Sequence, residues 1–558
     1  MTMNRKIEIL DTTLRDGCQG LGISFTTADK LKIIECLSAF GVDYIEAGSP
    51  GSNPKDVEVF QQLSLANSSS KDAVCCEHCC GERGKQKTSV VAFGATVRKN
   101  LSPREDESIA ALLAAGTDTV VVFGKSSVEQ VERVLGVTLE ENISMVRRTV
   151  EYLIKQGRGV IFDAEHFFDG YKHNPDYAFE TLRTAVAAGA NTVVLCDTNG
   201  GSLPDEVKSI VSAAVRFVSG LSVGGVPVKV GIHCHDDTGC AVANTIAAVN
   251  AGVIHVQGTF TGIGERCGNA NLSTVIPNLQ LKMKLDCVDR TSIGTLTATA
   301  RFIAQLANVR LAQSMPYVGA AAFAHKGGMH IDGVVKHAAS FEHVPPETVG
   351  NERTLLLSEV SGRGALLAKI KTIAPNLSKE DLVVKQIIDK VKELEHDGYQ
   401  FEAAEASFEL LVLKELGMYE SFFKISDYDV FSSPCRETRA LVRVCVGDKY
   451  EMTADYGNGP VNAVDKAFRK ALQVFYPTLA QMKLIDFKVQ ILDSNHNTAA
   501  TTRVLMESCC DDCQSWTTIG VGDNVIDASV IALADAAEYM LYNRGSSHNP
   551  LDETKTAE

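Results

Sequence analysis

Two histidines separated by one residue, His233 and His235, are the most informative residues of this 558-residue chain. They follow an apolar, β-branched run that predicts a strand, and residues two apart in a strand point to the same face. Two imidazoles on one face at a strand end form half of a site for a divalent metal ion. The alternative is that both are ordinary core or surface histidines, so further ligands must decide.

The elements that would position these histidines alternate between strand and helix from residue 5 to about 285. Eight strand–helix units in this length predict a (β/α)8 TIM barrel, an α/β fold. A doubly wound open sheet is the alternative, but no glycine-rich nucleotide turn follows the first strand. The predicted strands are Ile7–Asp11, Tyr44–Gly48, Ser89–Gly94, Thr119–Phe123, Gly159–Asp163, Thr192–Asp197, Val228–His233 and Ile254–Phe260.

Polar side chains recur where these predicted strands end. The carboxyl ends of the strands form the catalytic face of a TIM barrel. Polar residues placed at random on the surface would not favour one end repeatedly, so we expect the active site there. The candidates are Arg15, Asp16, Glu46, Glu165, His166, Asp197, Thr198, His233, His235, Glu265 and Asn269.

The rest of the chain predicts two further parts and a tail. Residues 1–287 form the predicted catalytic barrel, 288–398 a helical connector that contributes to the active site, and 399–545 an α+β regulatory or dimerisation domain. In the last of these, two strand–glycine turn–helix units follow one another, which indicates a pseudo-repeat of βα units. Two unrelated αβ stretches are the alternative. Residues 546–558 are polar and predict a disordered tail.

Composition and charge argue against several classes of function. The formal net charge of −15 argues against a nucleic-acid partner. No run of 18 apolar residues is present, so no membrane span is expected. Sixteen cysteines without a secretory signal indicate reduced thiols and a cytoplasmic location. The cysteine clusters Cys75–Cys80 and Cys509–Cys513 predict solvated thiol-rich loops, with a structural zinc site as the alternative.

Three motifs together resemble a family of metal-dependent TIM-barrel acyltransferases and lyases. They are Asp11–Gly17 (DTTLRDG), His233–Asp237 (HCHDD) and Gly262–Ala270 (GIGERCGNA). The family includes the 2-isopropylmalate, homocitrate and citramalate synthases and the HMG-CoA lyases, and the resemblance covers nearly the whole chain. Within it, Gly48–Asp56 and Asp163–Tyr171 look like the long type of citramalate synthase.

The resemblance implies an activity and several ligands. The activity is a Claisen-type condensation of acetyl-CoA with pyruvate and water, which gives citramalate and CoA on a route to isoleucine. A 2-isopropylmalate synthase that uses 2-ketoisovalerate is the main alternative, and a lyase and a non-catalytic sensor are others. The family also implies a divalent cation (Mg, Mn or Zn), an amino-acid effector at the C-terminal domain, in particular isoleucine, and a homodimer.

The resemblance also assigns roles to individual residues. The metal ligands would be Asp16, His233, His235 and Asn269. The substrate-binding residues would be Gln19, Glu46, Glu165 and Thr198. The catalytic residues would be Arg15, Glu265 and His330, the last oriented by Asp332. These types suit the chemistry, because arginine keeps its charge beside a developing alkoxide and the pKa of histidine suits a general base.

Three phenylalanines bear on the substrate and on catalysis. Phe167 and Phe168 follow the fifth predicted strand, where we expect them to narrow the pocket around the methyl group of pyruvate. Phe341 stands in the connector where the family usually has a tyrosine. Any role of that phenol is therefore lost or moved to another group.

Overall fold

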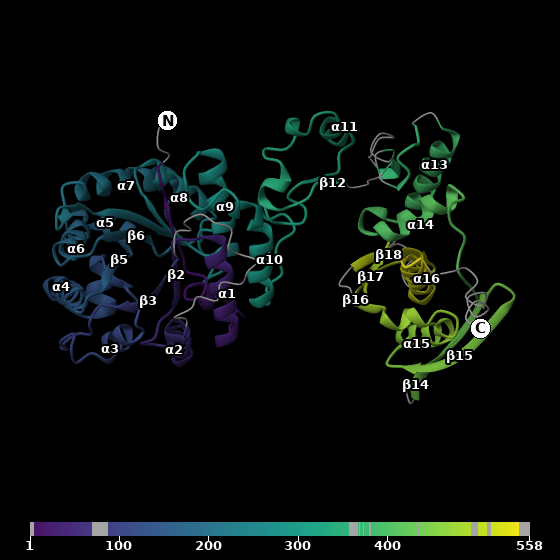
Figure 1. Ribbon diagram of the computed structural model, residues 1–558, viewed down its shortest axis with the longest axis horizontal. Coiled ribbons are helices and arrows are strands. Elements are labelled where there is room, and N and C mark those ends of the chain that lie inside the picture. Colours follow the sequence, from purple (N-terminus) through teal and green to yellow (C-terminus); the bar gives the residue numbers. More distant parts are fainter. Residues whose placement is uncertain are drawn as a thin grey trace. The chain divides into compact units, whose positions relative to one another are not determined.

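The computed structural model divides the chain into two compact units (Figure 1). Unit one comprises residues 1–323 and 344–353, and unit two comprises residues 324–343 and 354–558. The predicted connector at 288–398 is therefore shared between the two units.

The residues that the structure describes are 5–69, 88–355, 367, 369–371, 373–378, 381–433, 436–492, 500–510 and 515–545. The cluster Cys75–Cys80, part of the cluster Cys509–Cys513 and the tail at 546–558 lie outside them. None of the described helices is long and apolar enough to cross a membrane.

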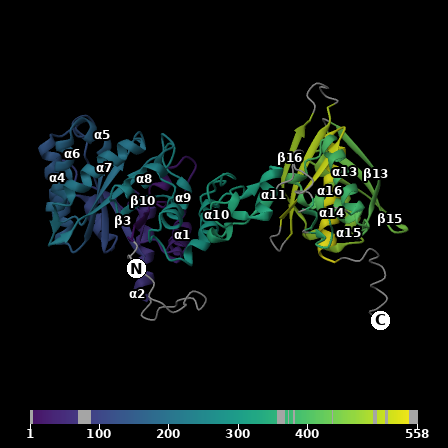
Figure 2. The same ribbon diagram turned by 90° about the horizontal axis from the view of Figure 1, so that it is seen from above.

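Unit one contains a closed ring of eight parallel strands, in agreement with the predicted barrel, and helices surround the ring (Figure 2). The order around the ring is β1-β10-β9-β6-β5-β4-β3-β2. The strands are β1 (Glu8–Asp11), β2 (Tyr44–Gly48), β3 (Ser89–Ala95), β4 (Thr119–Lys125), β5 (Gly159–Glu165), β6 (Thr192–Asp197), β9 (Lys229–Cys234) and β10 (His255–Gly258), with a small hairpin of β7 (Ser222–Val223) and β8 (Val226–Pro227). The helices are α1 (Thr27–Phe40), α2 (Pro54–Ser69), α3 (Glu107–Ala114), α4 (Leu139–Lys155), α5 (Phe167–His173), α6 (Pro175–Ala187), α7 (Pro204–Val218), α8 (Ala241–Asn250), α9 (Leu272–Pro277) and α10 (Leu296–Leu306).

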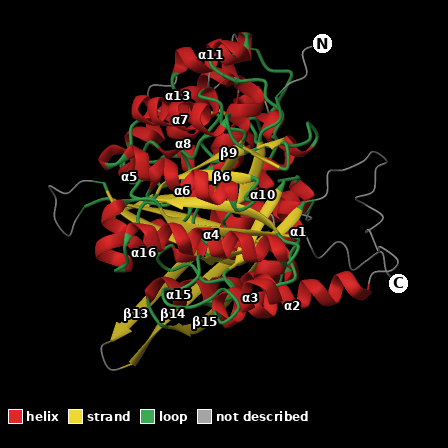
Figure 3. Cartoon of the chain, turned by 90° about the vertical axis from the view of Figure 1, so that its left-hand side faces the viewer, coloured by secondary structure: helices red, strands yellow, loops and turns green. Residues whose placement is uncertain are grey.

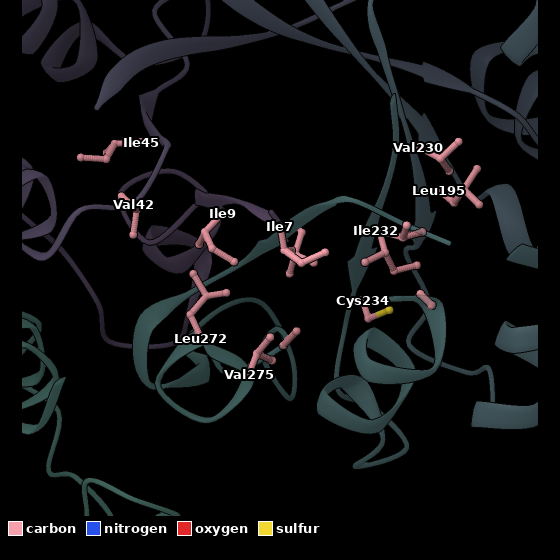
Figure 4. Packing of buried hydrophobic residues seen from close by; sticks show 14 of the residues in the cluster. Ile7, Ile9, Val42, Ile45, Leu195, Val230, Ile232, Cys234, Leu272 and Val275 are labelled. Atoms are coloured by element: carbon pink, nitrogen blue, oxygen red, sulfur yellow. The ribbon is translucent and has the colours of Figure 1, made fainter. Parts of the chain in front are cut away.

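Alternation along the strands separates two apolar layers. Ile232 and Cys234 of β9 belong, with Ile9 of β1, to the large cluster that packs the ring against its helices (Figure 4). A smaller cluster fills the ring itself, with Leu10, Val91, Val121, Ile161, Val194 and Cys196. His233 and His235 alternate with Ile232 and Cys234, so their side chains point into the ring, as the strand pattern predicted.

Helix α1 shows how local sequence fixes the loop that carries the first functional residues. Thr26 and Asp29 form a capping box in which each side chain accepts a hydrogen bond from the other's backbone N–H. Such a cap contributes about 1 kcal/mol. It sets the start of the helix, on which Lys30 is buried and donates to the carbonyl oxygen of Leu14 at 2.7 Å. This contact holds the chain immediately before Arg15.

Unit two contains two three-stranded antiparallel sheets, each followed by a helix. Figure 3 shows β13, β14 and β15 in yellow with α15 in red. Each repeat that the sequence predicted as one strand and one helix therefore has three strands and one helix. The elements are β13 (Lys424–Ser433), β14 (Arg436–Val446), β15 (Lys449–Gly457), α15 (Pro460–Gln473), β16 (Lys483–Ile491), β17 (Thr502–Cys509), β18 (Ser515–Gly522) and α16 (Val525–Asn543), preceded by β11 (Ala324–His325), α11 (Gly328–Lys336), β12 (Thr354–Leu355), α13 (Leu382–His396) and α14 (Glu405–Glu415).

Candidate active site

A cavity of about 250 Å³ opens among the carboxyl ends of the barrel strands. Eleven residues were predicted as metal ligands, substrate-binding residues or catalytic residues, and eight of them line this cavity; the other three are Glu46, Asn269 and His330. The volume suits a small substrate group rather than a large one. The lining residues are Arg15, Asp16, Gln19, Phe93, Phe123, Asp163, Glu165, Cys196, Thr198, His233, His235 and Glu265.

Three potential metal ligands converge in this cavity. The ligand atoms of Asp16, His233 and His235 all lie within 4.8 Å of one another. Oδ2 of Asp16 is 3.2 Å from Nε2 of His233 and 4.0 Å from Nε2 of His235. Burial and the neighbouring His233 lower the pKa of His235 to about 4, so its imidazole is neutral and has a lone pair to offer.

Asp16 stays ionised in spite of its burial. Burial alone would raise the pKa of Asp16, but the charge of Arg15 and the neighbouring imidazole of His233 hold it well below its usual range. The other carboxylate oxygen, Oδ1, is buried and has no hydrogen-bond partner among the described residues. A buried anionic oxygen without a partner is costly unless a ligand satisfies it.

Asn269 provides a second buried oxygen that has no hydrogen-bond partner among the described residues. It forms an isolated backbone bridge with His235, and its amide nitrogen donates to the carbonyl oxygen of Ile263 at 3.3 Å. Its Oδ1 is buried and unpaired within the described part of the chain. Two imidazole nitrogens with carboxylate and amide oxygens form a donor set that fits Mg, Mn or Zn.

Arg15 is held in place by three contacts. Its Nε donates to Oε2 of Glu46 at 2.5 Å, its Nη1 lies 3.2 Å from Oδ2 of Asp16, and its guanidinium carbon lies 3.8 Å from the ring centroid of Phe93. Burial alone would lower the pKa of Arg15, but Glu46 and Asp16 raise it above its ordinary value. Glu46 is fully buried behind the cavity wall, so it touches Arg15 and does not face the cavity.

Glu165 and Thr198 line the cavity at the ends of β5 and β6. Nζ of Lys125 lies 2.6 Å from Oε2 of Glu165, so the carboxylate is neutralised by an ion pair. The hydroxyl oxygen of Thr198 accepts a hydrogen bond from the backbone N–H of His166 at 2.8 Å. Lys125 was not among the predicted residues, although it ends β4 two positions after Phe123 and thus shares its face.

Phe93 and Phe123, not Phe167 and Phe168, form the aromatic wall of the cavity. The rings of Phe93 and Phe123 stack with centroids 5.3 Å apart and planes at 14°. The prediction for Phe167 and Phe168 is wrong, because both are fully buried in the outer apolar layer. His166 adopts a left-handed backbone conformation (φ 56°), and α5 begins at the next residue, which turns both rings away from the cavity.

His330 and Phe341 belong to unit two, and the structure describes their surroundings within that unit. His330 lies on α11 and is exposed. Its ring stacks on Phe341, with centroids 4.4 Å apart and planes at 29°. Asp332 forms an ion pair with Lys336 at 2.6 Å instead of orienting His330. The catalytic role of His330 stays a prediction.

Comparisons with known proteins agree with this fold. The HMGL-like family model matches residues 6–303, the homocitrate synthase post-HMGL domain-like model matches 317–398, and the LeuA allosteric (dimerisation) domain matches 402–541. Curated relatives cover nearly the full chain. The (R)-citramalate synthase of Aquifex aeolicus is 45% identical over 97% of this chain and 98% of its own length, and that of Geobacter sulfurreducens is 42% identical over 96% and 98%.

A 2-isopropylmalate synthase of Pyrococcus furiosus is more distant, at 29% identity over 96% of this chain and 99% of its own length. The family models thus assign this chain an HMGL-like barrel domain, a post-HMGL domain and a LeuA-type domain. The chain belongs to the HMGL-like family and, within it, to the group of (R)-citramalate synthases.

Proposed function

We propose that this chain condenses acetyl-CoA with pyruvate and water to give (R)-citramalate and CoA, on a route to isoleucine. The observation that carries this proposal is the cavity, in which a small volume and a stacked aromatic wall adjoin convergent metal ligands. This combination suits a short keto acid whose only carbon substituent is a methyl group. The similarity to (R)-citramalate synthases supports the same activity.

The carboxylate, imidazole and amide donors around the cavity would hold a divalent cation. When bound, such an ion supplies Lewis-acid polarisation of the keto group. Arg15 would place a fixed positive charge beside the carbonyl oxygen and stabilise the alkoxide that develops there. Such a preorganised donor is worth about 3 kcal/mol, or about a hundredfold in rate. The proposed ligands are Asp16, His233, His235 and Asn269.

Contacts to the keto acid would come from three side chains on the cavity wall. Because the oxygen of Thr198 already accepts from a backbone N–H, its own hydrogen is free to donate to the carboxylate of pyruvate. Lys125 neutralises Glu165, so that Glu165 does not repel this carboxylate. Gln19 adds an amide to the same wall. Glu46 would act on the substrate only through Arg15.

We assign proton transfer at the methyl group of acetyl-CoA to Glu265 and His330. Glu265 lines the cavity and its side chain is 57% exposed, so it is open to an entering thioester. The assignment predicts that His330→Gln stops the exchange of the acetyl methyl protons with heavy water, while His337→Gln in the same unit leaves the exchange unchanged. Equal exchange in both variants would remove His330 from the mechanism.

Substrate choice is the decisive test of the proposed reaction. Release of CoA is followed with a thiol reagent, with pyruvate or 2-ketoisovalerate at equal acetyl-CoA. We expect kcat/KM for pyruvate to exceed that for the branched acid at least about tenfold, because an extra pair of methyl groups must fit between fixed aromatic walls. A preference for 2-ketoisovalerate would instead identify a 2-isopropylmalate synthase.

We further propose that unit two binds isoleucine and joins two copies of the chain. The match to an allosteric dimerisation domain and the two βββα repeats support this role. Millimolar isoleucine should inhibit CoA release, and leucine at the same concentration serves as the comparison. Light scattering should give a dimer mass. If isoleucine neither binds nor inhibits, the effector assignment fails.

A further inference from the structure

We infer that Gln257 and Asp163 form a positioning pair that fixes the tautomer and the orientation of His233 so that it can bind the cation. Neither Gln257 nor Asp163 was among the predicted site residues. The inference rests on the proposed metal site, and it explains how one of its ligands is prepared.

The pair is a continuous chain of hydrogen bonds inside the barrel. Nδ1 of His233 lies 2.9 Å from Oε1 of Gln257, and Nε2 of Gln257 donates to Oδ1 of Asp163 at 3.0 Å. Gln257 is fully buried and Asp163 is 3% exposed, so water does not compete for these groups. Gln257 on β10 and His233 on β9 are register partners on adjacent parallel strands, whereas Asp163 on β5 is reached across the interior of the ring.

The chemistry of these groups gives the chain of hydrogen bonds one direction. Nε2 of Gln257 donates to Asp163, so the NH2 group of the amide faces the carboxyl group. The carbonyl oxygen of Gln257 must then face His233, and a carbonyl oxygen only accepts. In the neutral ring, which is the form that binds a cation, Nδ1 of His233 therefore carries the hydrogen, and Nε2 keeps its lone pair, 3.2 Å from Oδ2 of Asp16.

Without this pair the opposite tautomer would be favoured. A neutral His233 with its hydrogen on Nε2 could donate to the carboxylate of Asp16, which is an attractive charge-assisted hydrogen bond. That bond would occupy the nitrogen and the oxygen that the cation needs. Partners that orient a ligating histidine in other proteins contribute about 10- to 100-fold in metal affinity.

The first test compares Gln257→Leu with Asn244→Leu. Asn244 is a matched control, because it is equally buried and its amide donates to the backbone of Ser202 without touching His233. Binding of Zn²⁺ or Mn²⁺ to metal-free protein is measured by calorimetry. We expect Gln257→Leu to bind about 10- to 100-fold more weakly than wild type and Asn244→Leu to bind as wild type does.

The second test reads the tautomer directly. In metal-free protein labelled with ¹⁵N-histidine, the ring nitrogens of His233 should report hydrogen on Nδ1 in wild type, and this signature should be lost in Gln257→Leu. Wild-type affinity together with an unchanged ring signature in Gln257→Leu would overturn the inference.

A double variant provides a rescue that a purely structural role does not predict. Gln257→Glu combined with Asp163→Asn exchanges the carboxylate and the amide but preserves the direction of the hydrogen bonds: the introduced amide donates to the introduced carboxylate, which accepts from His233. We expect affinity within about threefold of wild type, well above that of Gln257→Leu. The double variant also serves as the test if Gln257→Leu fails to fold. If it has neither the metal affinity nor the His233 tautomer of wild type, the inference is contradicted. If wild type itself binds no divalent ion, the proposed metal site fails, whatever the variants do.

Discussion

The two ends of the barrel both bring carboxylates next to histidines, but they use these groups differently. At the carboxyl end, Asp16 lies beside His233, and its second carboxylate oxygen is unpaired within the described residues. At the amino end, Glu8 of β1 uses its two oxygens for Lys229 of β9 and His255 of β10. The first arrangement leaves donors for a ligand, and the second ties neighbouring strands together. The comparison separates groups that serve the reaction from groups that serve stability.

The pKa values of the carboxylates reflect this difference. Burial alone would raise the pKa of Glu8, but hydrogen bonds from His255 and Lys229 lower it to about 2, so its charge stabilises the folded barrel. Burial raises the pKa of Asp163 in the cavity to about 7, so ionisation of this carboxyl group lowers the stability of the folded chain. A charge that costs stability at a strand end is typical of a functional site.

The largest expected effect tests the carboxyl end at its centre. Asp16→Asn removes the anionic ligand, and we expect turnover to fall at least about a thousandfold because the cation site loses its charge. Steady-state CoA release and the amount of bound metal measure this. Glu8→Gln removes a comparable carboxylate at the amino end and should keep wild-type turnover. Substantial activity in Asp16→Asn would break the assignment of the metal site.

A smaller loss of activity is expected when the guanidinium group of Arg15 is replaced by another positively charged group of different geometry. Arg15→Lys keeps a cation but cannot bind Glu46 and Asp16 together, and we expect kcat/KM to fall about a hundredfold. Arg98 makes an ion pair with Asp106 at 3.1 Å and is partly exposed, so Arg98→Lys is the control and should change kcat/KM by no more than about threefold. Similar losses in both variants would mean that the simultaneous contacts of Arg15 with Glu46 and Asp16 do not contribute to catalysis.

The aromatic wall should decide substrate choice with a more moderate effect. Phe123→Leu enlarges the cavity, and the ratio of kcat/KM for 2-ketoisovalerate to that for pyruvate should rise about tenfold. Phe168→Leu changes a ring of the same type in the outer apolar layer, where it should lower stability and leave this ratio unchanged. A ratio that responds to Phe168 instead would contradict the position of the wall.

The smallest expected effect belongs to the amino end. Glu8→Gln should cost about 1 kcal/mol of stability at pH 7, a value reduced because Lys229 is partly exposed, and should lower the Tm by a few degrees. Because the pKa of Glu8 in the folded chain lies below its ordinary value near 4.5, the stabilisation is complete above that value and is lost as the pH falls towards 2. Calorimetry should therefore show the difference between wild type and variant shrinking from pH 7 to pH 3.

The sequence predicted the barrel and most of the cavity, because both depend on local patterns. Strand alternation placed His233 and His235 on one face, and polar residues at strand ends identified the catalytic end. The sequence did not distinguish Phe93 or Gln257 from core residues. A side chain that points into the ring either fills its core or faces the cavity, depending on how close it lies to the carboxyl end of the strand. The placement of Phe167 failed because the sharp turn at His166 leaves no periodic signal.

Closure of the ring has a consequence for the newborn chain. β1 pairs with β2 soon after both are synthesised, but its other neighbour is β10, and Glu8 and His255 are 247 residues apart. At ordinary translation rates the first strand waits roughly 12 to 50 s on the ribosome with an open edge. Of the proposed ligands, Asp16 precedes this wait, His233 and His235 are made near its end, and Asn269 follows β10, so the full set is present only in chains that can already close the ring.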